Sequence, residues 1–240
     1  MERKLFLKQG FAALGMTFIA PLANSCKKND IAADETTGGS DTGSGSDTCT
    51  VAPTETEGPF PTKNPSAYER KDITDGRSGY KLTVNITVGQ VSKSCAALAG
   101  AIVDIWHCDA EGNYSEYGGT QMQSTNYSSV HFLRGRQTTD SNGLVTFTTI
   151  FPGWYQGRAT HIHVHIYNAS GTSLKVTQIA FPEGSGSALL AVNGYSKGMS
   201  GYTYNASDNI FSDDKDGVEM STVTGDKTNG FSLAIQLNVP

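Results

Sequence analysis

Residues 51–240 are predicted to form an all-β sandwich with long connecting loops. Two observations lead to this fold class. Apolar and polar residues alternate in short segments throughout this part of the chain, and clusters of Gly, Asn, Asp and Ser separate these segments. No window has the period of a long amphipathic helix, and only residues 187–192 suit a short helical turn. Short alternating strands separated by turn residues are typical of a two-sheet sandwich.

The expected strands have either this alternation or a short apolar run rich in β-branched residues. They cover residues 81–91, 101–106, 144–150, 161–167, 174–181 and 231–239. A domain that extends from residue 51 to residue 240 is long enough to bury a substantial core. We therefore expect one folded domain in this part of the chain.

The first 50 residues are expected to serve export and attachment. Residues 1–25 combine a basic start with an apolar stretch that is too short to span a bilayer, which is typical of an export signal. Small residues precede Cys26, as at a bacterial lipoprotein cleavage site, so we expect Cys26 to be lipidated. Residues 26–50 are rich in Gly, Ser, Thr and Asp and are expected to form a flexible linker. These features predict an exported, lipid-anchored protein of the bacterial cell envelope.

Charge and cysteine content narrow the class of protein further. The net charge is −5, and the 18 Lys and Arg residues form no basic cluster, which argues against a nucleic-acid partner. If Cys26 carries lipid, three cysteines remain for disulfide formation outside the cytoplasm. Cys108 directly follows an expected strand, whereas Cys49 and Cys95 lie in loop-like segments. We therefore expect a Cys49–Cys95 disulfide.

Residues 144–166 contain the most informative pattern in the chain. Three of the five histidines lie in the alternating run HIHVHI, which places them on one face of a strand at about 6.5 Å spacing. They are His161, His163 and His165. Tyr155 lies just upstream, on a turn that Pro-Gly imposes. Two imidazoles at this spacing and a nearby phenol could converge on one metal ion, although a surface strand whose polar face is histidine would have the same pattern.

Residues 103–117 form the second informative stretch, in which a strand ends and a turn delivers Tyr114. A tyrosine at such a place more often packs over the strand end. With both stretches together, the chain resembles the intradiol ring-cleaving dioxygenases, the catechol and protocatechuate family that uses non-haem ferric iron. The matching pieces, in chain order, are TEGPFP (56–61), RKDI (70–73), IWHCDAEGNY (105–114), FLRG (132–135), FTTIFPGWY (147–155), Arg158, HIH (161–163), Gln178 and FP (181–182).

The resemblance implies an iron site and a reaction. It places the Fe(III) ligands at Tyr114, Tyr155, His161 and His163. It also implies that Arg158 stabilises negative charge on the substrate, that Gln178 lies near the substrate ring, and that Tyr155 acts as a base as well as a ligand. The implied reaction inserts both atoms of O2 into a catechol-type aromatic and yields a cis,cis-muconate-type diacid.

The donor chemistry agrees with this implied metal. Phenolates are hard anionic donors that suit Fe(III), and a trivalent ion can ionise a phenol whose ordinary pKa is about 10. A 2-His-1-carboxylate site for Fe(II) would need an acidic residue at ligand spacing, and none is placed as well as these tyrosines. His165 departs from the family pattern, and its role is left open.

Two other functions remain possible from the sequence. One is a zinc or copper enzyme that uses all three histidines of the strand. The other is a non-enzymatic surface lipoprotein that binds a glycan or another protein. Colour separates these hypotheses, because tyrosinate bound to Fe(III) absorbs visible light and zinc does not.

Overall fold

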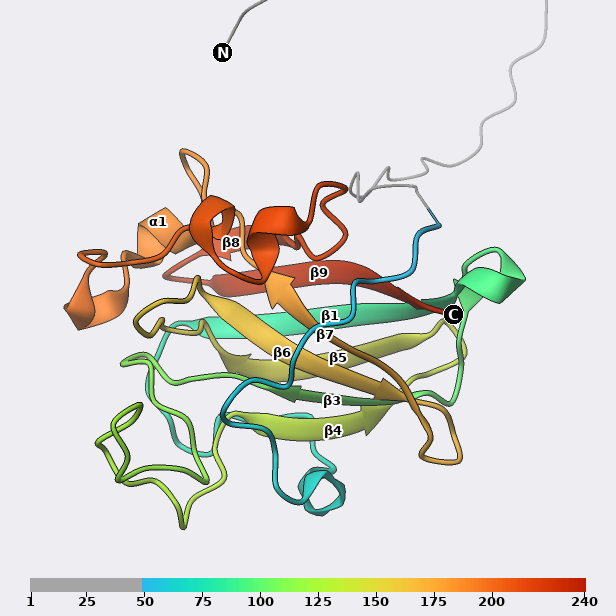
Figure 1. Ribbon diagram of the computed structural model, residues 1–240, viewed down its shortest axis with the longest axis horizontal. Helices are drawn as coiled ribbons and strands as arrows, with labels where there is room; N and C mark the ends of the chain where they lie inside the picture. The colour runs from blue at the N-terminus through green and yellow to red at the C-terminus, as the bar shows by residue number, and fades with distance from the viewer. Residues whose placement is uncertain (1–48) are drawn as a thin grey trace, which may run out of the picture. The chain divides into compact units, whose positions relative to one another are not determined.

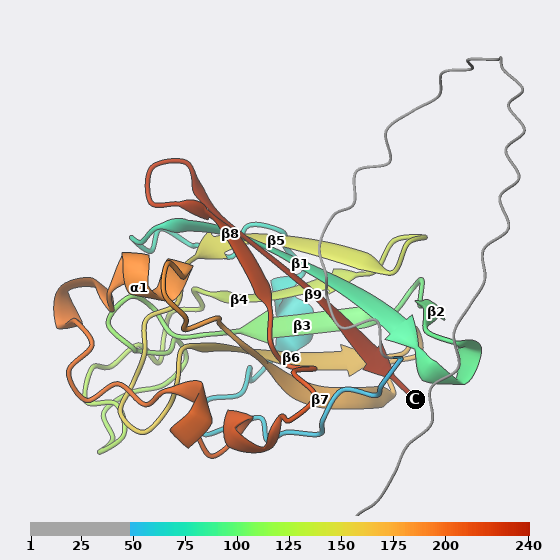
Figure 2. The same ribbon diagram turned by 90° about the horizontal axis from the view of Figure 1, so that it is seen from above.

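Two β-sheets form a sandwich in the computed structural model, which describes residues 49–240 (Figures 1 and 2). The first sheet has the order β4 (Arg134–Thr138), β3 (Ile102–Trp106), β6 (His161–Tyr167) and β7 (Ser173–Ala180), all antiparallel. The second contains β8 (Thr222–Asp226), β9 (Gly230–Val239) and β1 (Lys81–Gln90), with β5 (Leu144–Ile150) and the short β2 (Ala96–Ala97) both paired to β1. The predicted all-β class is confirmed. The expected export signal, Cys26 and most of the linker lie outside the described residues.

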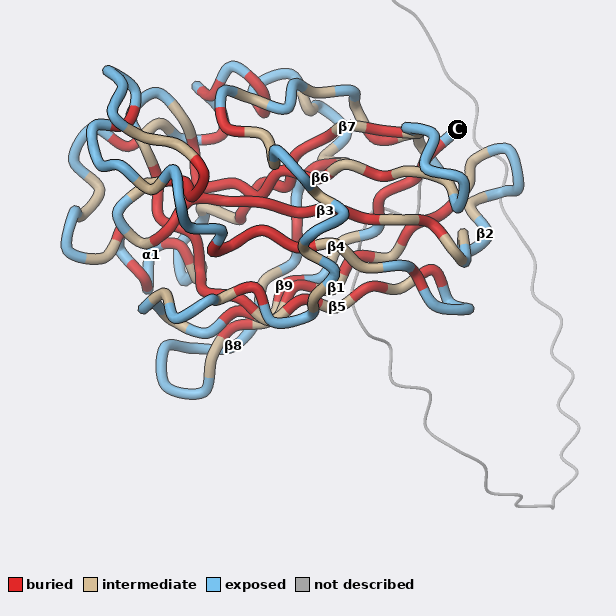
Figure 3. The backbone as a smooth tube through the Cα atoms, turned by 90° about the horizontal axis from the view of Figure 1, so that it is seen from below, coloured by how far each residue is buried: buried red, intermediate tan, exposed pale blue. Residues whose placement is uncertain are grey.

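The core lies between the two sheets. Alternation turns one face of each strand inward, so that Ile162 and Val164 of β6 are fully buried, as are Val84 and Ile86 of β1. Figure 3 shows the buried stretches along the central strands and the exposed residues mainly in the connecting loops. The inner face of β6 therefore packs into the core, and its histidines lie on the outer face of the first sheet.

The outer face of β6 is less exposed than its alternation predicts. A half-buried strand would leave His161 and His163 in solvent, but both are at most 2% exposed. Loops cover this end of the sheet, and one of them is the segment that begins at Cys49 and crosses β7 in Figure 1. There Glu55 N donates a hydrogen bond to the Val176 carbonyl. The covered end of the sheet is a natural place for an enclosed site.

Helical structure is confined to short segments. They are α1 (Ala188–Val192), η1 (Pro65–Tyr68), η2 (Val91–Lys93), η3 (Tyr195–Lys197), η4 (Asn205–Ser207) and η5 (Phe211–Asp213). The Ser187 side chain caps α1 by accepting a hydrogen bond from Leu190 N. In the part of the chain that the structure describes, no helix has the length and apolar character needed to cross a membrane.

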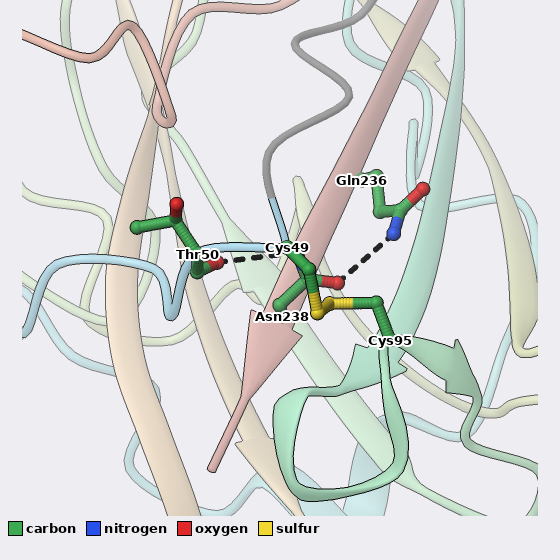
Figure 4. The surroundings of a disulfide bond; sticks show 5 residues. All are labelled: Cys49, Thr50, Cys95, Gln236 and Asn238. Atoms are coloured by element: carbon green, nitrogen blue, oxygen red, sulfur yellow. Dashed lines mark hydrogen bonds between the residues drawn. A yellow bond between two sulfur atoms is a disulfide. The ribbon is translucent and has the colours of Figure 1, made fainter.

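Cys49 and Cys95, the pair expected from the sequence, are joined by a disulfide (Figure 4). The bond ties the first described residue to the loop between β1 and β2. Next to it, Asn238 Nδ2 donates to the Thr50 carbonyl at 3.1 Å and Ala52 N donates to the Asn238 carbonyl at 2.9 Å. These contacts fasten the start of the segment that crosses the first sheet.

Candidate active site

Cross-strand register brings the first set of site residues together. In the first sheet His163 of β6 lies opposite Trp106 of β3 on one side and Gln178 of β7 on the other. Directly opposed residues share a face, so these three side chains form one row on the outer face. The ring of Trp106 stacks parallel to that of His163, with centroids 4.9 Å apart. The sheet therefore holds the His163 ring in a fixed orientation.

Three possible ligand atoms meet at the end of this row. Tyr114 Oη lies 3.2 Å from His161 Nε2, which in turn lies 3.1 Å from His163 Nε2. His161 Nδ1 lies 2.6 Å from the Ala159 carbonyl oxygen, which can only accept, so Nδ1 carries the proton and Nε2 keeps a lone pair. The three side chains come from β6 and from the turn after β3, as expected from the sequence.

Burial sets the charge of these groups. It is the main cause that lowers the pKa of His161 to about 3, and the nearby Arg158 guanidinium lowers it further. Burial also lowers the pKa of His163 well below its ordinary value, so both imidazoles are neutral at physiological pH. The same burial raises the pKa of the Tyr114 phenol well above 10.

Tyr155 completes the group from the turn that follows β5. Its ring centroid lies 5.8 Å from that of Tyr114 and 5.6 Å from that of His161. Burial raises the pKa of Tyr155, whereas the Arg158 charge acts to lower it. Tyr155 is only partly buried and Tyr114 is fully buried, so Tyr155 is the more accessible of the two phenols.

These residues fit a ferric ion. Ligand atoms held about 2.0–2.1 Å from one ion at 90–109° lie about 2.8–3.4 Å apart, and the two separations around His161 fall in this range. Burial raises the pKa of both phenols, so they need a strong positive charge to become phenolates, and a trivalent metal supplies it. The four residues that can hold the metal are Tyr114, Tyr155, His161 and His163.

Arg158 is held beside this group by two partners from other elements. Its Nε donates to Asp208 Oδ2 at 2.9 Å and its Nη2 donates to Gln178 Oε1 at 2.7 Å. Gln178 Nε2 donates in turn to the Thr56 carbonyl at 3.1 Å. Asp208, which is fully buried, also accepts from Ala159 N, two residues before His161. This chain of hydrogen bonds fixes the guanidinium relative to the β6 histidines.

Gly58 shows how closely the loop from Cys49 covers the site. Its φ is +67°, and a Cβ atom there would lie 2.9 Å from Cε1 of His163. Two residues later the Phe60 ring stacks on Tyr114 with centroids 4.8 Å apart. A larger residue at position 58 would displace either this loop or the imidazole.

The remaining histidines lie away from the candidate metal site. His165 Nδ1 lies 3.1 Å from Glu57 Oε1, and its Nε2 lies 2.8 Å from Ser173 Oγ. His107 is buried against Thr149, and His131 contacts Glu116. Within residues 49–240, no three His, Cys, Asp or Glu side chains are grouped as metal ligands. The alternative site made of three β6 histidines is therefore wrong.

Several residues around the site were missed from the sequence. Asp208 lies in a loop and gives no sign there that it pairs with Arg158. Gln123 Nε2 and Oε1 bond the Tyr114 backbone carbonyl and amide at 2.8 and 2.6 Å, and Arg134 bonds Ser115 beside it. Only the FLRG match pointed to Arg134, and it suggested no role. Cys108, which follows an expected strand, is buried with Phe60 and Tyr114 and has no disulfide partner among residues 49–240.

Comparisons with known proteins identify the class to which this fold and site belong. A family model described as "Dioxygenase" (Dioxygenase_C) matches residues 56–191, more than half of the chain. The chain is 28% identical to an intradiol ring-cleavage dioxygenase from Tetranychus urticae, with a TM-score of 0.68, and the match covers 80% of this chain and 94% of that one. No curated protein matches the sequence.

Two further solved structures are similar. One is the dioxygenase domain of a dioxygenase and carbohydrate-binding protein fusion from Streptomyces sp. SirexAA-E, with 25% identity, a TM-score of 0.57 and coverage of 79% and 97%. The other is 3-chlorocatechol 1,2-dioxygenase from Rhodococcus opacus 1CP, with 19% identity, a TM-score of 0.53 and coverage of 78% and 72%, which shows the fold alone. The protein belongs to the intradiol ring-cleavage dioxygenase family.

Proposed function

We propose that the protein is a non-haem Fe(III) dioxygenase that inserts both atoms of O2 into a catechol-type aromatic and opens its ring to a cis,cis-muconate-type diacid. The convergence of Tyr114 Oη with the Nε2 atoms of His161 and His163, beside Tyr155, is the observation that carries the proposal. When bound, the ferric ion supplies the charge that ionises the catechol and withdraws electron density from its ring.

The two tyrosines have different tasks in this proposal. Tyr114 is fully buried, and Gln123 and the Phe60 ring hold it in place, so it remains a fixed ligand. Tyr155 is more accessible and lies beside Arg158, whose charge partly opposes the rise that burial causes in the pKa of its phenol. Tyr155 Oη is therefore the atom that takes a proton from a catechol hydroxyl.

Arg158 supplies a fixed positive charge next to the reacting ring. Its hydrogen bonds to Asp208 and Gln178 are made before substrate arrives, so little reorganisation is needed when negative charge develops. Gln178, one strand away from His163, holds this arginine and the backbone of Thr56. The aromatic rings of Phe60 and Trp106 exclude water from the same side of the site. The lower local dielectric strengthens the interaction of the Arg158 charge with a developing negative charge.

Iron content, visible absorption and oxygen uptake test the proposal together. The purified protein should contain iron and absorb visible light, and it should consume O2 with members of a catechol panel. Tyr114→Phe should lose most of the iron. Tyr167→Phe, at the far end of β6, should retain it because Tyr167 contacts His165 and not the proposed ligands. The proposal would be overturned if the purified protein is colourless and lacks iron, or if Tyr114→Phe leaves the iron content unchanged.

We also propose that this enzyme acts in the bacterial cell envelope, attached through lipid on Cys26. The pattern of residues 1–50 supports this placement. A lipid anchor with a flexible linker would hold the catalytic domain close to the membrane without embedding it.

A further inference from the structure

Arg134 is a charged residue with no place in the proposed chemistry, although it lies in the middle of the structure around Tyr114. It begins β4 and is fully buried. Burying a guanidinium is expensive unless its donors are satisfied and its charge is balanced. The partners that offset this cost therefore show what the side chain holds.

The Arg134 guanidinium bonds two separate segments of the chain. On one side its Nε donates to Ser115 Oγ at 2.9 Å and its Nη2 donates to the Ser115 carbonyl at 2.6 Å. On the other side its Nη1 donates to the Phe60 carbonyl and to Thr62 Oγ1, each at 3.0 Å. Glu116 Oε2 lies 3.4 Å from Nε and balances the charge.

Both segments adjoin Tyr114. Ser115 is the next residue along the chain, and the Phe60 ring stacks on the Tyr114 ring. The hydroxyl of Ser115 also donates to the Phe132 carbonyl at 2.6 Å, which ties this backbone to the loop before β4. One planar group thus fixes the backbone that carries the phenol and the aromatic wall against which the phenol rests.

We propose that Arg134 is a positioning residue whose planar fork sets where Tyr114 Oη lies relative to His161 Nε2. This inference rests on the proposed role of Tyr114 as an iron ligand. The fork matters here rather than the charge, because Glu116 already balances the charge and the separate donors of a guanidinium reach both segments at once. A lysine would keep the charge but could not bond Ser115 and Phe60 in this geometry.

Arg134→Lys tests this, with Arg136→Lys as the matched control. Arg136 lies two residues along β4 and forms a two-point pair with Asp104 at 2.6 and 2.7 Å, so its substitution also removes a guanidinium fork, here a partly buried one. Both variants are purified, and their iron content, visible absorption band and turnover of catechol are compared with those of the unaltered protein. Arg134→Lys should shift or weaken the band and lower kcat by about 10- to 100-fold, the cost of a displacement of about 1 Å. Arg136→Lys should leave the band and kcat unchanged.

Ser115→Ala keeps the inference testable if Arg134→Lys does not fold. It removes one acceptor of the fork, and Glu116 remains beside Nε, so the charge is not left alone. A shifted absorption band with iron retained, in Arg134→Lys or in Ser115→Ala, supports the inference. Loss of iron from folded Arg134→Lys, but not from Arg136→Lys, also supports it. An unaltered band and kcat in Arg134→Lys, or in Ser115→Ala where the first variant is unfolded, would overturn it. If the unaltered protein lacks iron or cleaves no catechol, the proposed function fails instead.

Discussion

Glu219 should make the free energy of unfolding fall as pH rises, and a single substitution can test this. The residue is fully buried before β8, where its Oε1 accepts from Thr177 Oγ1 at 3.1 Å. Its Oε2 has no hydrogen-bond partner in residues 49–240. Burial, and then the nearby charge of Glu55, raise the pKa of Glu219 from 4.5 to about 8. The carboxyl is therefore protonated in the folded protein at neutral pH.

The sign of the effect follows from proton binding. Between pH 4.5 and about 8 the unfolded chain has lost this proton and the folded chain retains it, so stability falls as pH rises. The contribution is fully present below pH 4.5 and is lost as pH rises through about 8. The slope is about 1.4 kcal/mol per pH unit, which amounts to about 3 kcal/mol by pH 7.

Glu219→Gln removes this proton and keeps the shape of the side chain. We expect the variant and the unaltered protein to have equal free energies of unfolding near pH 4.5, and the variant to be more stable by about 3 kcal/mol at pH 7. Urea unfolding between pH 4.5 and 8 measures the difference. Glu69→Gln, at an exposed position, controls for the loss of one acidic group. Parallel pH profiles for Glu219→Gln and the unaltered protein would refute the reasoning.

Three further predictions concern the site and the anchor. Tyr155→Phe should bleach part of the visible absorption and lower turnover more than iron content, because three ligands still hold the metal; equal losses of iron and turnover argue against its role as a base. His163→Ala should lose iron while His165→Ala keeps it, since His165 contacts Glu57 and Ser173; metal analysis showing the reverse would reassign the ligands. Cys26→Ser should move intact, active enzyme into the soluble fraction, and continued sedimentation with membranes would contradict lipid anchoring.

The strands that alternation predicted are those whose inner face enters the core. Six expected segments correspond to β1, β3, β5, β6, β7 and β9, with ends that differ by at most one residue. The strand β4 was not predicted, because its sequence RGRQT has neither alternation nor apolar residues. Its place in the sheet depends on partners elsewhere, including Asp104 for Arg136 and the Ser115 and Phe60 carbonyls for Arg134. The strand β8, with sequence TVTGD, is an exposed edge strand and is equally weak in its local signal.

Some features of the site could also be predicted from neighbouring residues, whereas others depend on distant parts of the chain. The spacing of His161 and His163 on one strand face, with Tyr155 on the preceding turn, is a property of about ten residues and was visible in the sequence. Whether these groups bind iron stays a prediction, but the structure does bring them together with Tyr114. Their burial was not visible, because it depends on loops from distant parts of the chain that cover the outer face of the first sheet.

Contacts between distant segments set the position of the charged group and the packing around the candidate ligands. The guanidinium of Arg158 is held by Asp208, fifty residues away, and by Gln178 on β7. Likewise, Gly58 is needed because the segment that the Cys49–Cys95 disulfide anchors passes within contact of the His163 ring. A short local motif can therefore specify the ligand types, whereas the charge, dryness and rigidity that make them reactive arise from segments that meet only after the two sheets have formed.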